Sequence, residues 1–303
     1  LNTFTHIVVD EAHYFVKDAG FNAKANISLA KIIGSNCTKI FMSATIDGFQ
    51  KVYLQLMKDM NKFHIFNNIR YSMTQSKLHI ASIEEIVHES QISEILRELY
   101  GKTLIFVDSI EKGRKLKKEL DPICSVGMIT SESKESEEIN EKELFDSLIE
   151  KEKFDTDILI ATSVIDNGVN IKDENLKNII IQNCDKDEII QMIGRKRCLN
   201  KDDKVRVFLV SSSGQSLSKK IEGLEEQKQL FEQTSRDLLV YQKPHMWFLD
   251  DSAFGRDYRT SIYYIPEFNA LFANYFGYQA IKIQLNYLYE LKSENSQFET
   301  KVK

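Results

Sequence analysis

The chain has 303 residues, 42% of them hydrophobic, which is enough to bury one large core or two ordinary ones. Its formal net charge of −5 excludes a generally basic protein that coats nucleic acid, although a local basic groove is compatible with it. The 4 cysteines show neither zinc spacing nor a dense disulfide framework, and no apolar run approaches the roughly 20 residues of a membrane helix, so the composition predicts a cytoplasmic protein with reduced thiols.

The first predicted element is a short apolar strand that ends on two carboxylates. Residues 7–9 show no polar alternation, which is typical of a parallel strand covered on both faces, and Asp10 and Glu11 follow directly. Ligands of open α/β sheets bind beyond the carboxyl ends of such strands. One carboxylate could hold a phosphate-bound Mg²⁺ through its waters while the other orients an attacking water. The alternative for an isolated Asp-Glu pair is a solvated acidic turn.

The following elements continue an alternation of helix and strand. A helix is predicted over residues 23–33, a strand over 39–42, a helix over 47–59 and a weaker strand over 63–66. Ser43 and Thr45 follow the 39–42 strand, where small hydroxyl residues could relay a hydrogen bond between a nucleotide site and a neighbouring domain. The triplet Ser43-Ala44-Thr45 would be an ordinary turn sequence if it stood alone. It gains weight here because it lies about one βαβ unit after the acidic strand.

A polar stretch over residues 67–76 lacks apolar periodicity and predicts the connection between two domains. A second alternation begins after it. Its strands are predicted at residues 77–83, 104–107, 126–129, 157–161, 176–181 and 205–210, and its helices at 91–100, 110–120 and around 144–149. Buried strands separated by helices predict an α/β fold with a parallel sheet.

The first chemical stretch of this second block is a buried strand followed by a hydroxyl pair and a turn around Gly168. Such a turn can offer the Thr162 hydroxyl and backbone N–H groups to a phosphodiester, which would be a contact independent of base sequence. The alternative is an ordinary connection between a strand and a helix.

The second stretch is a helix, capped by Asp185 or Asp187, that carries Gln191 and Arg195 on one face. An arginine held in this way can neutralise charge that develops on a γ-phosphate in a neighbouring domain's site. The alternative is a solvated basic helix end favoured by the helix macrodipole, and this alternative explains Lys196 better than Arg195.

The sequence contains no phosphate-cradling loop of the form Gly-x-x-x-x-Gly-Lys-Ser/Thr. The nearest candidate is Gly101-Lys102-Thr103, but Leu96 occupies the position of the first glycine, and Thr103 leads into a strand where such a loop must open a helix. We therefore interpret Gly101 as a helix C-cap. The chain starts at Leu1, one turn from a central strand, which predicts a fragment of a longer protein.

The order of these stretches resembles motifs II to VI of superfamily 2 DEAD/DEAH-box helicases. The matching segments are DEAH at 10–13, SAT at 43–45, TLIFVDS at 103–109, ATSVIDNGVNI at 161–171 and QMIGRKR at 191–197. The resemblance spans about residues 4–213. It implies an α/β fold of tandem RecA-like parallel-sheet domains, with ATP in the cleft between them and nucleic acid across their top. Residues 1–74 would be the C-terminal part of an incomplete first domain, 75–213 the second domain, and 214–303 a helical accessory region.

The resemblance also implies a role for each matching residue. By the family pattern Asp10 coordinates Mg²⁺ through water, Glu11 is the catalytic base, and His13 couples hydrolysis to movement together with Ser43 and Thr45. The remaining assignments are Gln191 and Gly168 at the nucleotide, Arg195 and Arg197 at the phosphates, and Ser109 and Thr162 at the nucleic acid.

The sequence departs from the family in two places. The second arginine of motif VI usually lies seven residues after the glutamine, and Cys198 occupies that position here. Arg197 could take its role if the helix unwinds before residues 199–200. The larger departure is the missing motif I, so we expect the 303-residue chain alone to be inactive.

The resemblance stops at about residue 216. Apolar spacing predicts a long amphipathic helix over about residues 217–238 and an aromatic-rich helix over 268–291. We expect these helices to pack against the second domain and not to stack nucleic-acid bases.

The function that the resemblance implies is an ATP-dependent helicase or translocase that moves on DNA or RNA. One alternative is a non-catalytic nucleic-acid-binding remnant or scaffold, and another is the motor part of a restriction or defence assembly. The presence of both Glu11 and Arg195 favours an enzyme, because a binding module needs no general base.

Overall fold

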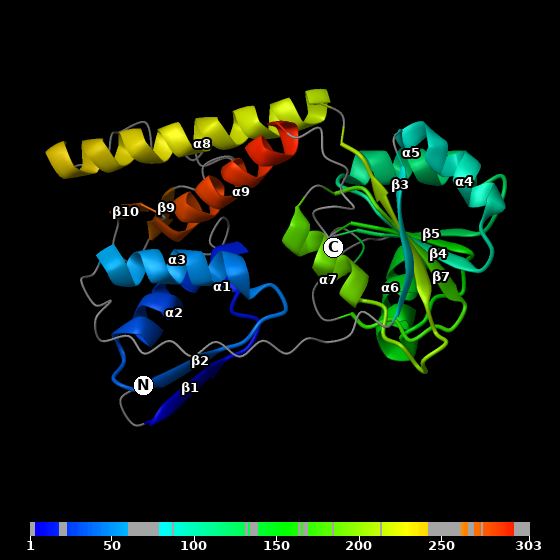
Figure 1. Cartoon of the computed structure of the whole chain (residues 1–303), viewed down its shortest axis with the longest axis horizontal. Helices are drawn as coiled ribbons and strands as arrows, with labels where there is room; N and C mark the ends of the chain where they lie inside the picture. The colour runs from blue at the N-terminus through cyan, green and yellow to red at the C-terminus, as the bar shows by residue number, and fades with distance from the viewer. Residues whose placement is uncertain are drawn as a thin grey trace. The chain divides into compact units, whose positions relative to one another are not determined.

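The computed structural model describes residues 4–17, 23–59, 79–86, 88–130, 133, 139–162, 165, 169–183, 185–212, 214–241, 262–265, 270–273 and 275–293. These residues form two compact units (Figure 1). The first unit combines residues from 1–70 with residues from 214–295, whereas the second takes its described residues from 71–213. The predicted α/β class with C-terminal helices is confirmed.

The second unit is built on a 6-stranded sheet in which all neighbouring strands are parallel. The strand order is β3-β8-β7-β4-β6-β5. The strands are β3 (Ile80–Ile86), β4 (Lys102–Phe106), β5 (Val126–Ile129), β6 (Ile158–Ala161), β7 (Leu176–Ile181) and β8 (Val205–Val210). Because all of them run in the same direction, the residues that follow them share one edge of the sheet, and ligands of such sheets bind at that edge.

Helices cover both faces of this sheet. On one face lie the short 3₁₀ helix η3 (Glu89–Gln91), α4 (Ile92–Glu98) and α5 (Ile110–Leu120), and apolar side chains of α4 and α5 share one core cluster with Ile105 and Ile160. On the other face α6 (Ile139–Lys151) packs so closely that a Cβ added to Gly127 would lie 2.6 Å from Leu144 Cδ2, and α7 (Lys186–Gly194) contacts β7. All four residues of β6 are buried, as expected for a parallel strand covered on both faces.

Most elements of the second unit lie where the sequence predicts them. Helix α5 and strands β5, β7 and β8 have the predicted bounds. Strand β3 begins at Ile80, not at residue 77, and α4 ends at Glu98, before the predicted end at residue 100. The predicted strand over 63–66 and connection over 67–76 lie outside the described residues.

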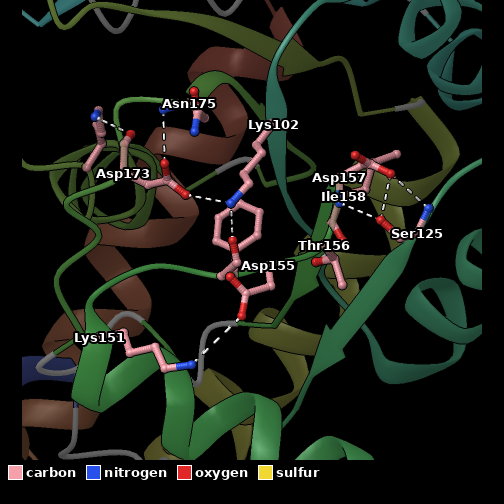
Figure 2. A network of polar contacts seen from close by, with 11 residues as sticks. Lys102, Ser125, Lys151, Asp155, Thr156, Asp157, Ile158, Asp173 and Asn175 are labelled. Carbon is pink, nitrogen blue, oxygen red and sulfur yellow. Dashed lines mark hydrogen bonds and ion pairs between the residues drawn. The ribbon is translucent and has the colours of Figure 1, made fainter.

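The Gly101-Lys102-Thr103 segment does not form a phosphate loop. Gly101 lies just after α4 in the left-handed region, with φ 77°, and a Cβ there would lie 2.9 Å from Asn175 O, so the position requires glycine. Lys102 begins β4, and its Nζ donates to Asp173 Oδ2 at 2.9 Å and to Phe154 O. Figure 2 shows these contacts at the amino edge of the sheet.

A second group of contacts at this edge joins the starts of β5 and β6 (Figure 2). Asp157 Oδ2 accepts from Ser125 Oγ at 2.6 Å and from Ser125 N at 3.1 Å, and Asp157 N donates to Ser125 Oγ at 2.8 Å. The hydrogen bonds from the side chain and backbone of Ser125 hold the pKa of Asp157 below its usual range. At the amino edge, polar contacts therefore link the start of β4 to Asp173, which precedes β7, and the start of β5 to that of β6.

The first unit contains a two-stranded parallel sheet, β1 (His6–Val9) with β2 (Thr38–Phe41). Helices α2 (Ala23–Gly34) and α3 (Ile46–Asp59) correspond to the helices predicted over 23–33 and 47–59, whereas the short α1 (Tyr14–Lys17) was not predicted. One apolar cluster, which we call the first core, consists of Ala12, Leu29, Ile33, Phe49, Val52, Tyr53 and Met57. Val8 and Ile40, which pair across the sheet, are exposed on its other face.

The C-terminal elements are α8 (Gly214–Tyr241), the antiparallel pair β9 (Ile262–Ile265) and β10 (Ala270–Ala273), and α9 (Tyr275–Ser293). The predicted helix over 268–291 therefore begins later, after a strand that the sequence did not indicate. Helix α9 packs against α8 and also contacts α1 and α3, and Ile283 lies against the first core. The sequence led us to expect this helix on the second domain, but the structure assigns it to the first unit.

None of the helices among the described residues is both long and apolar enough to cross a membrane.

Candidate functional site

The acidic turn, residues 10–13, connects β1 to α1 in the first unit. Met42 N donates to Val9 O at 2.9 Å, and Ala12 N donates to Met42 O at 2.8 Å. These two bonds extend the pairing of β1 and β2 beyond both strands. They bring the residues that follow the two strands, including Ser43, into contact with the acidic turn.

His13 is the centre of this contact. Its side chain is buried, and Nδ1 lies 2.8 Å from Ser43 Oγ and 3.2 Å from Glu11 Oε2. Ser43 Oγ also accepts from Thr45 N at 3.1 Å. An Nδ1 without a proton would direct its lone pair at the Glu11 carboxylate, so we assign the proton to Nδ1. The structure thus joins the three residues that the sequence assigned to coupling, His13, Ser43 and Thr45.

Glu11 has an unusual backbone and side chain. Its φ is 51°, in the left-handed region that residues with a Cβ rarely adopt. Its Oε2 is buried and, among the described residues, has the His13 contact but no well-aligned hydrogen bond. A buried carboxylate oxygen without a full set of donors can accept a proton or orient a water.

Asp10 is exposed, and its Oδ1 accepts from Glu11 N at 2.9 Å. Mg²⁺ keeps several waters and is commonly held by one or two carboxylates, so a single exposed aspartate fits an ion that is bound through water. No cluster of three or more acidic, histidine or cysteine side chains suited to a metal occurs within the described residues. The acidic turn therefore fits a largely hydrated Mg²⁺ and not a metal enclosed by protein ligands.

The second group of candidate residues lies in the second unit, at the end of α7. Asp185 is the N-cap, because its Oδ1 accepts from Asp187 N at 2.9 Å and from Glu188 N at 3.0 Å. Between the predicted alternatives, the structure selects Asp185. At the other end of α7, Gln191 and Arg195 are both buried, and Arg195 Nη2 donates to Gln191 Oε1 at 3.1 Å. The predicted common face of these two side chains is confirmed.

Residues 195–197, the arginine segment, leave the helix and contact residues 169–171, with Lys196 forming a parallel bridge to Ile171. Ile171 N donates to Arg195 O at 2.8 Å, and Arg197 N donates to Ile171 O at 2.9 Å. Arg195 Nη1 also donates to Val169 O at 3.4 Å. The two stretches that the sequence treated separately are therefore one assembly.

Arg197 is exposed, and its Nε donates to Asn170 Oδ1 at 2.8 Å. Helix α7 ends at Gly194, so Arg197 lies on the extended continuation of the chain and not on a helical face. The neighbouring Cys198 is exposed. The sequence allowed Arg197 a role only if the helix unwinds before residues 199–200, and the helix does end before them.

Lys196 contradicts the sequence-based interpretation. A solvated basic helix end predicts an exposed lysine, but the exposed fractions of the Lys196 and Asp203 side chains are 0% and 1%. Lys196 Nζ donates to Asp203 Oδ2 at 2.6 Å and to Asp173 O at 2.7 Å. Burial works to raise the pKa of Asp203, but the hydrogen bonds from Lys196 and from Leu199 N outweigh it and hold this pKa below its usual range.

The candidate nucleic-acid residues lie at the carboxyl edge of the sheet. Ser109 follows β4 and caps α5, since its Oγ accepts from Lys112 N at 3.2 Å. Thr162 follows β6, and its N donates to Ile129 O at 3.2 Å. The adjacent strands β4 and β6 place both residues at the same edge. Gly168 lies outside the described residues.

Four residues that the sequence did not indicate contribute to the second group: Val169 and Asn170 through their contacts to the arginines, and Asp173 and Asp203 through their contacts to Lys196. Asn170 lies within the motif-like stretch 161–171, which was a signal for its position. Asp173 and Asp203 lie outside every motif, and no local pattern distinguishes them from surface acids.

Residues 88–200 match the family model described as the helicase conserved C-terminal domain. This match supports the resemblance to superfamily 2 helicases and the RecA-like fold of the second unit. It covers the arginine segment and residues 169–171, and it excludes the acidic turn. No curated protein matches the chain.

Solved structures similar to the chain include a variant of S. cerevisiae Dbp5 bound to RNA and ADP BeF3, with 18% identity and a TM-score of 0.49 over 72% of this chain and 57% of that one. S. cerevisiae Dbp5 bound to RNA and ADP BeF3 has 16% identity and a TM-score of 0.48 over 72% and 56%. A DEAD box protein from Methanococcus jannaschii has 19% identity and a TM-score of 0.39 over 69% and 54%. The chain spans less than two thirds of the length of each of these proteins.

Proposed function

We propose that the chain is part of an ATP-dependent helicase or translocase of superfamily 2, which couples ATP hydrolysis to movement on nucleic acid. The observation that carries the proposal is the assembly of Gln191, Arg195 and residues 169–171 inside the region that matches the helicase C-terminal domain. The presence of Glu11 together with Arg195 favours an enzyme over a domain that only binds nucleic acid, because such a domain needs no general base.

In this proposal the acidic turn acts on the phosphates. Asp10 would hold Mg²⁺ through water, and the ion, when bound, neutralises charge on the phosphate oxygens. Glu11 would orient the attacking water and take its proton, and the partly satisfied Oε2 supports this role. His13 would link a change in the protonation or position of Glu11 to Ser43 and Thr45, because its Nδ1 contacts both Glu11 Oε2 and Ser43 Oγ.

Arg195 would stabilise the negative charge that develops on the transferred phosphoryl group, with Gln191 fixing its guanidinium. The proposal requires that Arg195 reaches the nucleotide during the catalytic cycle. Arg197, which is exposed beside Asn170, would contribute a second and less constrained positive charge.

The test of the catalytic assignment is a comparison of the two arginines in the ATP-hydrolysing protein. Arg195→Ala should leave ATP binding largely intact and lower turnover by about 10³-fold or more, which is the scale of arginine-finger losses. Arg197→Ala should lower turnover less, because Arg197 is exposed and has one side-chain contact among the described residues. Phosphate release and nucleotide binding are measured for both variants.

Glu11→Gln serves as the reference for complete loss in that comparison, because it keeps the shape of the side chain and removes the base. If the two arginine variants have equal and mild effects on turnover, the arginine segment is only a basic surface without a catalytic role. If ATP turnover stimulated by nucleic acid persists in Glu11→Gln, Glu11 is not the catalytic base. Absence of hydrolysis in a protein that includes an upstream phosphate loop, with nucleic acid still bound, would favour a binding protein or scaffold.

The nucleic-acid contact should be made mainly to phosphates, through the hydroxyls of Ser109 and Thr162 and through backbone N–H groups. Affinity should therefore fall steeply as salt rises and vary little with base sequence. A titration of DNA and RNA oligonucleotides of several sequences, each at several salt concentrations, measures both dependences. Strong sequence preference with a flat salt dependence would contradict this mode of binding.

A further inference from the structure

Lys196 lies between the two candidate arginines and is fully buried, although lysine is among the residues that are almost never buried without a partner. Its ammonium contacts Asp203 Oδ2 at 2.6 Å and Asp173 O at 2.7 Å. Asp203 Oδ2 also accepts from Leu199 N at 3.0 Å. One carboxylate oxygen thus fixes both the side chain of Lys196 and the turn that follows the arginine segment.

Stability alone is a weak reason for this arrangement. Removing two charges from water costs about as much as their attraction returns, and well-packed apolar residues of similar volume usually serve the fold equally well. Asp203 Oδ1 is also buried and makes no hydrogen bond to any described residue, which adds to the cost. What an ion pair provides and an apolar pair does not is a defined geometry at both ends.

The contacts of Lys196 define the path of the arginine segment. Its backbone pairs with Ile171, and the two bonds of that pairing are made by the neighbours, Arg195 O and Arg197 N. Its side chain ends on Asp173 O. Residues 171 and 173 therefore hold the arginine segment at two points, one on the backbone and one on the Lys196 ammonium.

The second of these points is itself anchored to the sheet. Asp173 Oδ2 accepts from Lys102 Nζ, at the start of β4, at 2.9 Å, and Asp173 Oδ1 accepts from Asn175 N at 2.9 Å. Figure 2 shows both contacts. Lys196 is thus connected through Asp173 to a central strand of the sheet. This connection restricts the position of the Lys196 side chain.

We propose that the buried Lys196–Asp203 pair is a positioning device that sets the direction of Arg195 and Arg197. The inference rests on the proposed function, in which these arginines act on the phosphates. Lys196 and Asp203 are positioning residues in this scheme, because they act through the arginine segment and do not touch the substrate.

The decisive variant is the double substitution Lys196→Met with Asp203→Leu, which removes both charges together and leaves neither one unpaired. It should unfold at nearly the wild-type denaturant concentration. Its turnover should fall by about tenfold or more while the KM for ATP changes little, since the loss is one of transition-state orientation. Its amides at Ile171 and Arg197 should exchange hydrogen faster, because the pairing of the two segments loosens.

A matched control removes a different ion pair of the second unit, between Arg206 on β8 and Glu84 on β3, by Arg206→Met with Glu84→Gln. Both residues lie in strands of the sheet and not in the arginine segment. This control should change stability but keep turnover and the protection of the Arg197 amide. Asp203→Asn, which retains an acceptor for Lys196 and Leu199, is a second variant for the case in which the double variant does not fold, and it should keep more turnover than Asp203→Leu.

The outcomes separate the two proposals. Wild-type turnover together with wild-type amide exchange in the double variant would overturn the positioning role and leave a purely structural pair. Faster exchange at Ile171 and Arg197 in a protein whose hydrolysis does not depend on Arg195 would support positioning and reject the proposed function. Equal loss of turnover in the control and the double variant would also overturn the inference, because the effect would then not be specific to Lys196.

Discussion

At the scale of single residues, Glu11 and Glu152 share an uncommon backbone conformation, with φ of 51° and 53°. The left-handed region costs a residue with a Cβ roughly 1–2 kcal/mol. Glu152 directly follows α6, at a position where helices commonly end with glycine. Glu11 is the candidate base. The same strain thus occurs once at an ordinary helix end and once in the candidate site, where strained residues tend to cluster.

Replacing either residue by glycine should relieve this strain. Glu152→Gly and Glu11→Gly should each raise the free energy of unfolding by about 0.5–1 kcal/mol, because glycine adopts a positive φ without steric cost. The ion pair that Glu152 loses, to Lys172 Nζ at 2.6 Å, is partly exposed and therefore contributes little. Urea denaturation measures the stability of both variants.

Phosphate release distinguishes the two variants, since only Glu11→Gly should abolish hydrolysis. Glu152→Gly is the matched control, because it relieves the same strain away from the acidic turn. A Glu11→Gly variant that is less stable than wild type would show that contacts of the Glu11 side chain, such as that to His13, outweigh the backbone strain.

The sequence predicts candidate residues at this scale when they belong to a motif, and it fails where burial decides their role. The relation of Gln191 to Arg195 follows from helical spacing and is confirmed by their hydrogen bond. Lys196 was misread because its environment is made by Asp173 and Asp203, which come from outside the helix. A basic run at a helix end gives no local sign of which member turns inward.

At the scale of elements, α8 and α9 are joined by polar contacts along their length. Tyr278 OH donates to Glu232 Oε1 at 2.8 Å, and Tyr289 OH donates to Glu225 Oε1 at 3.1 Å. The rings of Phe231 and Tyr278 stack with centroids 4.2 Å apart. Because residue numbers rise on one helix as they fall on the other, the two helices are antiparallel.

The pairing of α8 and α9 should weaken at alkaline pH. Burial, followed by the hydrogen bond to Glu232, raises the pKa of Tyr278 from 10.0 to about 12. The neutral phenol is thus favoured in the folded state, so its contribution is complete below pH 10 and is lost as pH rises towards 12. Wild type should lose stability across this window, and Tyr278→Phe should lose less.

Denaturation followed by circular dichroism at several pH values measures that difference. Tyr289→Phe is the control, because its contact to Glu225 is exposed and contributes little. Parallel pH profiles for wild type and Tyr278→Phe would show that Tyr278 is not coupled to the pairing of α8 and α9.

The elements of the second unit could be predicted from the sequence more fully than the C-terminal ones. Strands such as β6 and β7 consist of consecutive apolar residues, which is the pattern of a strand buried on both faces. Residues 262–273 combine aromatic and aliphatic side chains that suit either a strand or a buried helix, and such short apolar runs cannot be told apart by periodicity. The strands β9 and β10 were missed for this reason.

At the scale of the whole molecule, one unit is continuous in the sequence and the other is not. The described residues of the second unit lie in one stretch, within 71–213, whereas the first unit joins residues from 1–70 with residues from 214–295. Helix α9 supplies Ile283 to the first core, against side chains more than two hundred residues earlier in the chain. No local pattern announces such a contact, so the sequence could define the helix but not its partner.

Substitutions in the two cores should therefore affect different parts of the chain. Ile283→Ala should destabilise the first unit by about 1–3 kcal/mol because it leaves space beside the first core, and Leu104→Ala should destabilise the second by about 2–5 kcal/mol. Hydrogen exchange at intermediate urea, resolved by peptide, measures each unit separately. Asn286→Ala, at an exposed position of α9, is the control. A single unfolding event shared by all peptides in both variants would contradict this independence.

The discontinuity of the first unit has a consequence for synthesis on the ribosome. Domains generally fold in the order in which they emerge, but here residues 4–57 emerge long before α9, and the second unit can complete its sheet in between. At about 5–20 residues per second, the nascent chain waits on the order of 10 to 45 seconds between Met57 and Ile283. During that interval Phe49, Val52 and their neighbours lack the cover that Ile283 supplies in the folded unit, so their apolar side chains stay accessible to solvent and to chaperones.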